Sequence, residues 1–382
     1  MTDLFSIIIN NLKSYNYKHF NIRLLLWVCM LTVLGILVIS SATDSNLYEK
    51  KQIIGFIMGM ILLITAALFN YKFILRFYWI FYFINLTLLL LVKIIGSNHL
   101  GAQRWIDLGP IQIQPSEFTK LFLILFFAAF LEKYQDILSE WKIILYICAL
   151  FFVPLLLVLS QPDLSTSIVI GCMFASMYFI AGLNYKRIAL FLGVFAVFLV
   201  VFLYLIMQPN QKLLKPYQLK RLTAFTHSDD PEYNDDNLQQ DNSIMAIGSG
   251  GLWGKGLNND TSTSVKNANY ILEPQTDFIF TIVGEELGFI GTMSVIILLL
   301  LIVIECFYVA ANAPDLSGKL IAVGFGFLVA MQSFVNIAVV TKIMPNTGLP
   351  LPFVSYGLSS LLSMFSCVGI VLNISLQRRD AY

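Results

Sequence analysis

Apolar runs of membrane-spanning length recur along almost the whole chain, and they limit what it can fold into. A helix that crosses a bilayer needs about 20 mainly apolar residues, and only 12% of the 382 residues are charged while 58% are hydrophobic. The sequence therefore predicts an all-α polytopic membrane protein with about ten transmembrane helices, near Leu24–Ser41, Ile53–Phe69, Phe77–Ile95, Phe118–Leu131, Ile143–Ser160, Thr166–Leu183, Ile188–Met207, Phe289–Ala310, Lys319–Val340 and Phe353–Ile374.

The basic residues between these runs predict the orientation in the membrane. Lys and Arg in short loops favour the cytoplasmic side, and most of them, such as Arg23, Lys72, Lys133 and Arg378, fall on the side that carries both termini. The expected division of the single domain 1–382 is a cytoplasmic segment at 1–23, helices 1–7 at 24–207, a large extracellular loop at 208–276, helices 8–10 at 277–376 and a cytoplasmic tail at 377–382.

Charge and cysteine usage exclude several function classes. The net charge of +1 gives no reason to expect a nucleic-acid partner. All five cysteines fall within apolar runs, where they are expected to be small buried hydrophobic residues. No group of His, Cys and carboxylate residues has the spacing of a zinc site. The remaining chemistry lies in polar stretches at the ends of the apolar runs.

Asp277 lies where the long polar loop meets an apolar run. An ionisable group at the membrane boundary is costly and is a candidate for function. The structural alternative is that Thr276 caps a helix and Asp277 complements the helix dipole in the first turn. A general base at this position needs partial burial to offset the dipole. Gly288 and Gly291 would permit a break before the eighth predicted helix.

A second polar stretch joins the third and fourth predicted helices. It contains Arg104 and Trp105, and Ser116 is the expected cap of the helix that follows. Glu117 and Lys120 are three residues apart, so they can pair on one helix face. Two interpretations stay open here. The two charges either neutralise each other at the membrane boundary, or Glu117 holds the Lys120 cation in place for a phosphate. In the second case Arg104 would bind the same phosphate as a bidentate clamp.

Two more stretches lie on the same predicted side. Asp163 precedes a helix, and capping is the simpler explanation of this acid. Residues 345–357 contain three prolines and Ser355, with Lys342 just before them. They predict a rigid non-helical lining, which is tolerated at membrane depth only where it is buried or faces a cavity.

The large loop has two parts. Residues 226–242 are acidic and polar, and they are a candidate for a mobile segment. The second part is the run Gly248-Ser249-Gly250-Gly251, which contains Ser249. Its glycines allow positive φ and close approach of a ligand. A flexible surface turn is the alternative. Because all these stretches fall on one predicted side, we expect their acids and cations to converge there.

Taken together, these stretches resemble the SEDS family (shape, elongation, division and sporulation proteins) of bacterial membrane glycosyltransferases. Gln103, Gln275 and Pro350 are typical of its RodA-like members rather than the FtsW-like or SpoVE-like ones. The motifs that carry the resemblance are Gly-Ala-Gln-Arg-Trp-Ile at 101–106, Gln-Pro-Ser-Glu at 114–117, Gln-Pro-Asp-Leu at 161–164, Gly-Ser-Gly-Gly at 248–251, Gln-Thr-Asp-Phe-Ile-Phe at 275–280, Gly-Glu-Glu-Leu-Gly at 284–288 and Pro-Leu-Pro-Phe-Val-Ser-Tyr-Gly at 350–357.

The resemblance implies polymerisation of lipid II into glycan strands on the outer face of the bacterial cytoplasmic membrane. The family's essential aspartate falls on Asp277, as general base, as ligand of Mg²⁺ or Mn²⁺, or as both. It also implies a class B penicillin-binding protein as partner. The residues expected to bind the lipid-linked diphosphate substrate are Arg104, Lys120, Glu117, Asp163, Trp105, Ser249, Lys342 and Ser355.

Two other functions remain open from the sequence. A lipid II flippase would suit a chain with charges inside its predicted helices, such as Lys93 and Glu305. Such a transporter needs polar groups along its whole path, whereas most charges here lie on the outer side. A scaffold that only recruits the transpeptidase is the third possibility. The chain departs from the family pattern at Glu273-Pro274, where the two residues are exchanged, and at Leu358, where a second glycine is usual.

Overall fold

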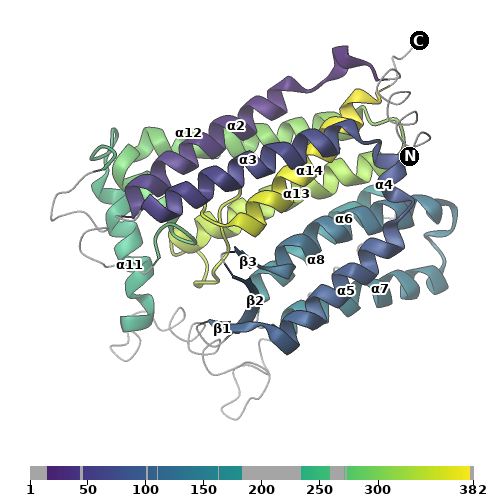
Figure 1. Ribbon diagram of the computed structural model, residues 1–382, viewed down its shortest axis with the longest axis horizontal. Helices are drawn as coiled ribbons and strands as arrows, with labels where there is room; N and C mark the ends of the chain where they lie inside the picture. Colours follow the sequence, from purple (N-terminus) through teal and green to yellow (C-terminus); the bar gives the residue numbers. More distant parts are fainter. Residues whose placement is uncertain are drawn as a thin grey trace.

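Most of the chain forms long helices that lie side by side (Figure 1). The computed structural model describes residues 15–43, 46–99, 102–109, 111–161, 163–182, 234–258, 271 and 273–378. The predicted seventh helix, 188–207, and most of the predicted large loop lie outside these residues. The helices are η1 Tyr17–His19, α2 Ile22–Ala42, α3 Asn46–Leu68, α4 Tyr71–Leu75, α5 Tyr78–Ile95, α6 Pro115–Lys133, η2 Gln135–Ile137, α7 Trp141–Ser160, α8 Leu164–Ile180, α11 Asn234–Ser249, α12 Ile279–Ala311, α13 Leu316–Val340 and α14 Leu358–Leu376.

The length and composition of these helices confirm the predicted polytopic helical membrane architecture. Seven of the described helices, α2, α3, α5, α7, α12, α13 and α14, are long and apolar enough to cross a membrane. Helices α6 and α8 occupy the positions of the fourth and sixth predicted spans. Helix α6 carries four charged residues and α8 has only 17 residues, so neither is among these seven.

Some predicted helix boundaries were wrong, but that of the eighth predicted helix was confirmed. Helix α12 contains a break at Gly288 with φ 65° and ψ −159°, so its second half matches the predicted helix Phe289–Ala310. The break itself confirms the role expected for that glycine. Helix α14 begins at Leu358, because Phe353 has a positive φ and the prolines before it disfavour a helix. Helix α3 starts earlier than expected, at Asn46.

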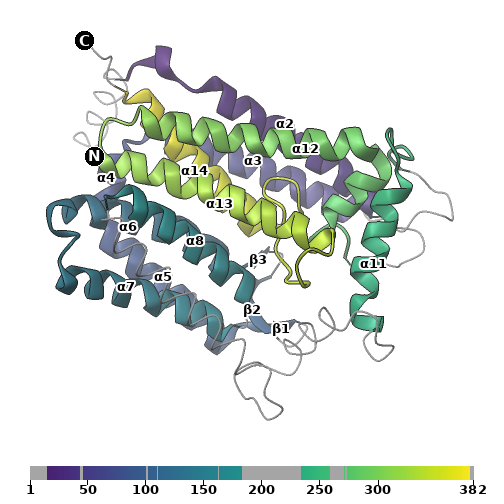
Figure 2. The ribbon, with the colours of Figure 1, turned by 180° about the vertical axis from the view of Figure 1, so that it is seen from behind.

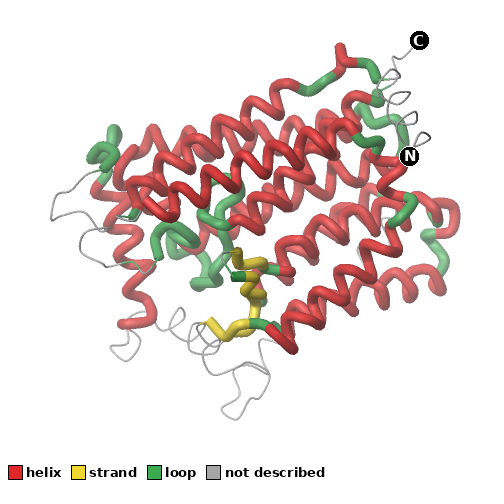
Figure 3. Tube along the Cα trace, in the orientation of Figure 1, coloured by secondary structure: helices red, strands yellow, loops and turns green. Residues whose placement is uncertain are grey.

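A small antiparallel sheet replaces the plain loop expected between α5 and α6. Its strands are β1 Ser97–His99, β2 Ala102–Leu108 and β3 Ile111–Ile113, in the order β1-β2-β3. Figure 3 shows this sheet beside the loops at one end of the bundle. We call this the sheet end. Strands of three residues carry too little alternation to be read from the sequence.

Helix α11 also corrects an expectation, because Asn234–Ser249 is helical where part of a mobile acidic segment was expected. It runs across the sheet end, next to the start of α12 (Figure 2). Its buried side is polar: the Ser243 hydroxyl bonds the Thr281 hydroxyl at 2.6 Å and donates to the Val340 carbonyl at 2.9 Å. A helix held by such bonds has no apolar stripe that would reveal it in the sequence.

Helices α13 and α14 form the centre of the bundle, and most of each is buried inside the protein. Close packing explains some of their glycines. A Cβ on Gly369 of α14 would lie 2.5 Å from the Leu63 carbonyl oxygen of α3. The same hydrophobic core continues among α6, α7 and α8, where the rings of Phe151 and Phe174 stack with centroids 4.1 Å apart.

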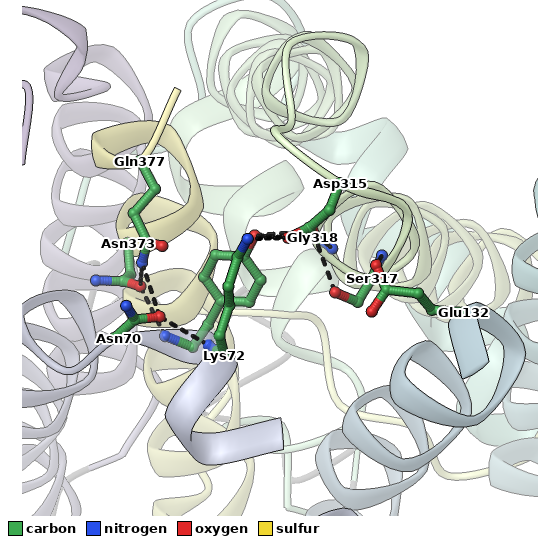
Figure 4. A network of polar contacts seen from close by, with 9 residues as sticks. Asn70, Lys72, Glu132, Asp315, Ser317, Gly318, Asn373 and Gln377 are labelled. Atoms are coloured by element: carbon green, nitrogen blue, oxygen red, sulfur yellow. Dashed lines mark hydrogen bonds and ion pairs between the residues drawn. The ribbon is translucent and has the colours of Figure 1, made fainter. Parts of the chain in front are cut away.

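At the end opposite the sheet, a polar network joins four helices (Figure 4). Asp315 caps α13 by accepting from the Gly318 amide at 2.8 Å, and it also accepts from Lys72 at 2.6 Å and from the Tyr71 hydroxyl at 2.7 Å. Asn373 of α14 accepts from the Tyr71 amide at 2.9 Å. Burial alone would raise the pKa of the Asp315 carboxyl, but the bonds from Lys72, Gly318 and Tyr71 outweigh it and lower that pKa.

Asp315→Asn should therefore lower the melting temperature in a pH-dependent way. A carboxyl whose pKa is lowered by folding stabilises the fold above its unfolded pKa of about 3.9. That stabilisation is lost as pH falls through the lower, folded pKa. We expect a clear difference in melting temperature between parent and variant at pH 7 that shrinks below about pH 4. Thermal unfolding in detergent measures it, with the exposed Asp136→Asn as control. A difference that does not change with pH would contradict this account.

Candidate functional site

The backbone just before α12 is fixed at three successive carbonyls. The Gln275 carbonyl accepts from the Tyr356 amide at 2.9 Å, and the Thr276 carbonyl accepts from the Ser355 hydroxyl at 2.6 Å. The Asp277 carbonyl accepts from the side-chain amide of Asn336 at 2.8 Å. Two of these donors belong to the proline-rich loop 345–357 and the third to α13, so all three peptide units are held from outside their own segment.

Asp277 itself lies in a turn before the helix and is half-buried. Its Oδ2 atom lies 3.1 Å from the point that a Cβ on Gly348 would occupy. The expected cap was wrong: α12 begins at Ile279, and the Thr276 hydroxyl donates to the Glu273 carbonyl at 2.9 Å. Asp277 is therefore not a first-turn helix residue. It points toward Gly348 in the proline-rich loop.

The proline-rich loop is held by polar side chains from several helices. Asn336 donates to the Leu349 carbonyl at 2.6 Å, and Gln332, one turn earlier on α13, donates to the Pro350 carbonyl at 2.9 Å. Ser165 at the start of α8 donates to the Thr347 carbonyl at 2.8 Å. Gln52 of α3 donates to the Ser355 carbonyl at 3.2 Å. The loop is non-helical, as expected, and residues 349 and 351–355 are buried within the protein.

Glu117 and Lys120 form the expected pair, and both are fully buried. The Lys120 ammonium donates to both carboxylate oxygens of Glu117 at 2.8 Å and to the Gln332 side-chain oxygen at 2.8 Å. The expected cap was wrong here too, because α6 begins at Pro115 with Gln114 as its cap. Three bonds use the three ammonium donors. Lys120 is thus linked through Gln332 to the loop beside Asp277.

Arg104 joins the sheet to the turn between α7 and α8. Its Nε donates to the Gln161 carbonyl at 3.0 Å, and the Gln161 side chain in turn donates to the Leu89 carbonyl at 3.1 Å. Asp163 caps α8, accepting from the Thr166 amide at 3.2 Å. The capping explanation of this acid is confirmed. Trp105 is partly buried beside Arg104 in β2.

The glycine-rich turn packs on protein backbone. A Cβ on Gly250 would lie 2.0 Å from the Gly284 carbonyl oxygen, and one on Gly254 would lie 2.1 Å from the Glu286 carbonyl oxygen. Gly251 accepts from the Phe289 amide at 2.8 Å, just after the break in α12. The flexible-turn expectation was therefore wrong. These glycines permit contact between two chain segments and cap the second half of α12.

The two glutamates of the Gly-Glu-Glu-Leu-Gly motif are structural contacts that sequence reasoning did not assign. Glu285 accepts from the Lys255 ammonium at 2.7 Å, and Glu286 accepts from the Ser41 hydroxyl at 2.5 Å. Both carboxylates are buried. Their neighbour Ser249 ends α11, where its hydroxyl donates to the Ala246 carbonyl at 2.7 Å.

The remaining predicted site residues also make contacts within the protein. Lys342 pairs with Asp241 of α11. The Ser355 hydroxyl accepts from the Leu351 amide at 2.7 Å while it donates to Thr276, so it joins the proline-rich loop to the Asp277 segment. The polar stretches noted in the sequence thus meet at the sheet end. Within the described ranges, no three His, Cys, Asp or Glu residues form a metal cluster.

Removing one member of the buried pair should be far more damaging than removing both. Glu117→Gln leaves the Lys120 charge buried without its counter-ion, which costs about 3–5 kcal/mol. The double variant Glu117→Leu/Lys120→Met should recover most of the loss in thermal stability. Asp241→Asn breaks the more exposed pair with Lys342 and should cost under about 1 kcal/mol. Equal losses of stability in Glu117→Gln and Asp241→Asn would contradict the conclusion that Glu117 and Lys120 form a buried ion pair.

The comparisons with known proteins agree with this arrangement. The sequence model of the FtsW/RodA/SpoVE family, described as cell cycle proteins, matches residues 19–380. The probable peptidoglycan glycosyltransferase FtsW of Trichlorobacter lovleyi is 35% identical over 95% of this chain and 95% of its own. Stage V sporulation protein E of Bacillus subtilis is 35% identical over 93% and 96%. The peptidoglycan glycosyltransferase MrdB of Escherichia coli is 33% identical over 97% of each.

Solved structures share the fold. A peptidoglycan synthase complex, described as coordinating polymerization and crosslinking, contains a chain with a TM-score of 0.76 and 28% identity over 94% of this chain and 97% of that one. The rod shape determining protein RodA of Thermus thermophilus has a TM-score of 0.68 and 26% identity over 96% and 98%. The chain therefore belongs to the FtsW/RodA/SpoVE family, the SEDS family of multi-pass membrane peptidoglycan glycosyltransferases.

Proposed function

We propose that this peptidoglycan glycosyltransferase polymerises lipid II for cell elongation, with Asp277 as its general base. The observation that carries the proposal is the way Asp277 is presented. Its backbone is held by the proline-rich loop and α13, while its half-buried carboxylate faces Gly348. A base needs a fixed position and partial burial, and this geometry supplies both.

The proposed reaction is an inverting transfer. The 4-hydroxyl of the acceptor sugar attacks the anomeric carbon of the donor, and the new C–O bond forms as the bond to undecaprenyl diphosphate breaks. Asp277 takes the hydroxyl proton, and the diphosphate leaves with the bonding electrons. A diphosphate leaves without strong acid, so a second carboxylic acid is not required.

The leaving diphosphate needs cationic groups to neutralise it. Arg104 is our candidate for a direct contact with the diphosphate. Trp105 follows it in β2, and Asp163 lies two residues after Gln161, to which Arg104 bonds, so both are candidates for the same site. Lys342 and Ser249 remain candidates for binding the rest of the substrate. We propose that Lys120, Glu117 and Ser355 act by positioning the loop, since they are buried and their polar atoms bond within the protein, whereas Lys342 and Ser249 are more exposed.

A divalent cation fits this site in one way. Mg²⁺ is often bound by a single carboxylate together with substrate phosphates, and Asp277 is a carboxylate of that kind. We propose that Asp277 holds Mg²⁺ or Mn²⁺ together with the substrate diphosphate, whose negative charge the ion would neutralise when bound. This is consistent with the lack of a three-ligand cluster in the described part of the chain.

We place the sheet end on the outer face of the membrane, with both termini in the cytoplasm. The opposite end carries Arg23, Lys72, Lys133 and Arg378 at the helix ends, as the positive-inside rule requires of a cytoplasmic side. A class B penicillin-binding protein is the proposed partner. A related chain occurs in a peptidoglycan synthase complex described as coordinating polymerization and crosslinking, which supports this partner.

The elongation role rests on Gln103, Gln275 and Pro350, which are typical of RodA-like members. The alternative is a division or sporulation role, since FtsW and stage V sporulation protein E relatives are 35% identical to the chain. Expression in rod-shaped cells depleted of their own RodA or FtsW tests this. Restored rod shape supports elongation, and restored septation without rod shape overturns it.

Asp277→Asn should abolish glycan synthesis while the protein still folds and binds its partner. The amide keeps the size of the carboxylate but cannot take the proton. The measurement is polymerisation of lipid II by the purified protein with Mg²⁺ or Mn²⁺ and the cognate transpeptidase, with moenomycin present to silence contaminating enzymes. Glycan at the parent rate from the variant would sink the mechanism. Lipid II crossing the bilayer without polymer would favour the flippase, and neither activity would favour the scaffold.

Gly348→Ala should slow polymerisation about tenfold or more, because misplacing a catalytic group by about 1 Å can cost about a hundredfold. The new methyl group would lie 3.1 Å from the Asp277 Oδ2 atom. Gly109 is the matched control, since it has the same φ of 73° and no atom of the described residues lies within 4 Å of the point that a Cβ would occupy. Gly109→Ala thus carries the same backbone strain without the contact. Equal rates for the two variants would show that the contact with Asp277 is irrelevant.

A further inference from the structure

A small polar cavity of about 150 Å³ lies at the end of the bundle opposite the sheet. It is formed by the start of α2 with the residues just before it, the end of α12 and the end of α14. Close to it in the chain, the Asn16 amide donates to the Leu376 carbonyl at 3.0 Å and ties the segment before α2 to the end of α14. The residues around it include Lys18, His19, Arg23, Tyr308, Asn312 and Arg378.

Among the described residues that line this cavity, the charged side chains are basic. Arg23 is paired with Glu305 at 3.1 Å, and Glu305 also accepts from the Asn21 side chain at 2.8 Å. This carboxylate is therefore neutralised within the protein. Lys18 and Arg378 remain as excess cations on the cavity wall. An anion that entered the cavity would meet the side chains of Lys18 and Arg378, which form no ion pair within the described residues, and the exposed side of Arg23.

Tyr308 arranges two of these cations. Arg378 donates to its hydroxyl at 3.1 Å and lies 5.9 Å from the ring centroid, while Arg23 lies 5.5 Å from the same centroid. The ring thus holds two guanidinium groups near one another despite their like charge. Planar guanidinium groups held in this way suit the oxygens of a phosphate.

The rim of the cavity faces the lipid. Ile22 in the first turn of α2 is 63% exposed, and Ile304, one turn before Tyr308 on α12, is 50% exposed. Tyr308 itself is 46% exposed, as expected of an aromatic residue at a membrane interface. Apolar side chains exposed on membrane helices contact acyl chains. Because these cations lie at the ends of membrane-spanning helices, we expect them at the depth of the headgroups, beside the acyl region.

We propose that this cavity binds the phosphate headgroup of an anionic phospholipid in the leaflet at this end of the protein. Basic pockets between transmembrane helices at the cytoplasmic side are suited to anionic headgroups. The shared chemistry is a phosphate, but the exposed apolar rim favours a lipid over a phosphate in solution. The inference does not depend on the proposed role of Asp277, which lies at the sheet end.

The test is native mass spectrometry of the full chain in detergent, with phosphatidylglycerol as probe. Phosphatidylcholine and soluble glycerol phosphate are the comparison ligands. The variant is Lys18→Gln/Arg378→Gln, which leaves the Arg23–Glu305 pair intact. The control is Lys319→Gln, an exposed cation in the first turn of α13 outside the cavity. Thermal unfolding without added lipid checks that the variants are folded.

We expect phosphatidylglycerol to bind the parent and Lys319→Gln equally and the double variant about 25-fold more weakly, since each cation near a membrane surface contributes about a factor of five. Phosphatidylcholine should bind weakly, and glycerol phosphate should not displace the lipid. Unchanged binding to a folded double variant, or equal binding of the two phospholipids, would overturn the proposal. Full displacement by glycerol phosphate would also overturn it, by showing a site for a soluble anion.

Discussion

The position of Asp277 depends on three hydrogen bonds to consecutive backbone carbonyls. Tyr356, Ser355 and Asn336 donate to the carbonyls of residues 275, 276 and 277. A carboxylate in a turn would otherwise move with the loop that carries it. Here the turn is fixed between α13 and the proline-rich loop, and the same Asn336 amide binds that loop at Leu349. The Asn336 side chain thus fixes the position of Asp277 relative to the proline-rich loop that its carboxylate faces.

The rest of the bundle supports this arrangement through buried polar contacts. The Glu117–Lys120 pair reaches the loop through Gln332, and Ser165 and Gln52 hold it from other helices. The opposite end has its own network around Asp315 and its own basic cavity. The proposed substrate chemistry and the proposed lipid contact therefore lie at opposite ends of the helices.

The sequence was a good guide where one local signal decides the structure. Long apolar runs predicted helices, the spacing of Glu117 and Lys120 predicted their pair, and Gly288 predicted the break in α12. It was a poor guide where contacts between residues far apart in the chain determine the structure. Helix α11 buries a polar face, and the glycine-rich turn packs against the backbone of α12. Neither segment has the apolar sequence pattern from which packing is usually predicted.

The same limit applies to the candidate site. Ser355 and Lys120 have the chemistry of substrate-binding groups, but their bonds to Thr276 and Gln332 come from segments 79 and 212 residues away. No local pattern reveals such contacts. Asn336, which lies within an apolar helix, carried no signal at all in the sequence. Asp277 was recognisable because an acid at the start of a long apolar run is unusual.

The most direct test of this account compares two buried asparagines. Asn336→Ala removes the amide that holds Asp277, and Asn373→Ala removes a similar amide, which donates to the Ala67 carbonyl at 2.7 Å away from the site. Each loss should cost about 1–3 kcal/mol of stability. Polymerisation per folded molecule, measured across pH, should fall about tenfold or more only for Asn336→Ala. Equal rates for the two variants would contradict the claim that Asn336 positions the base.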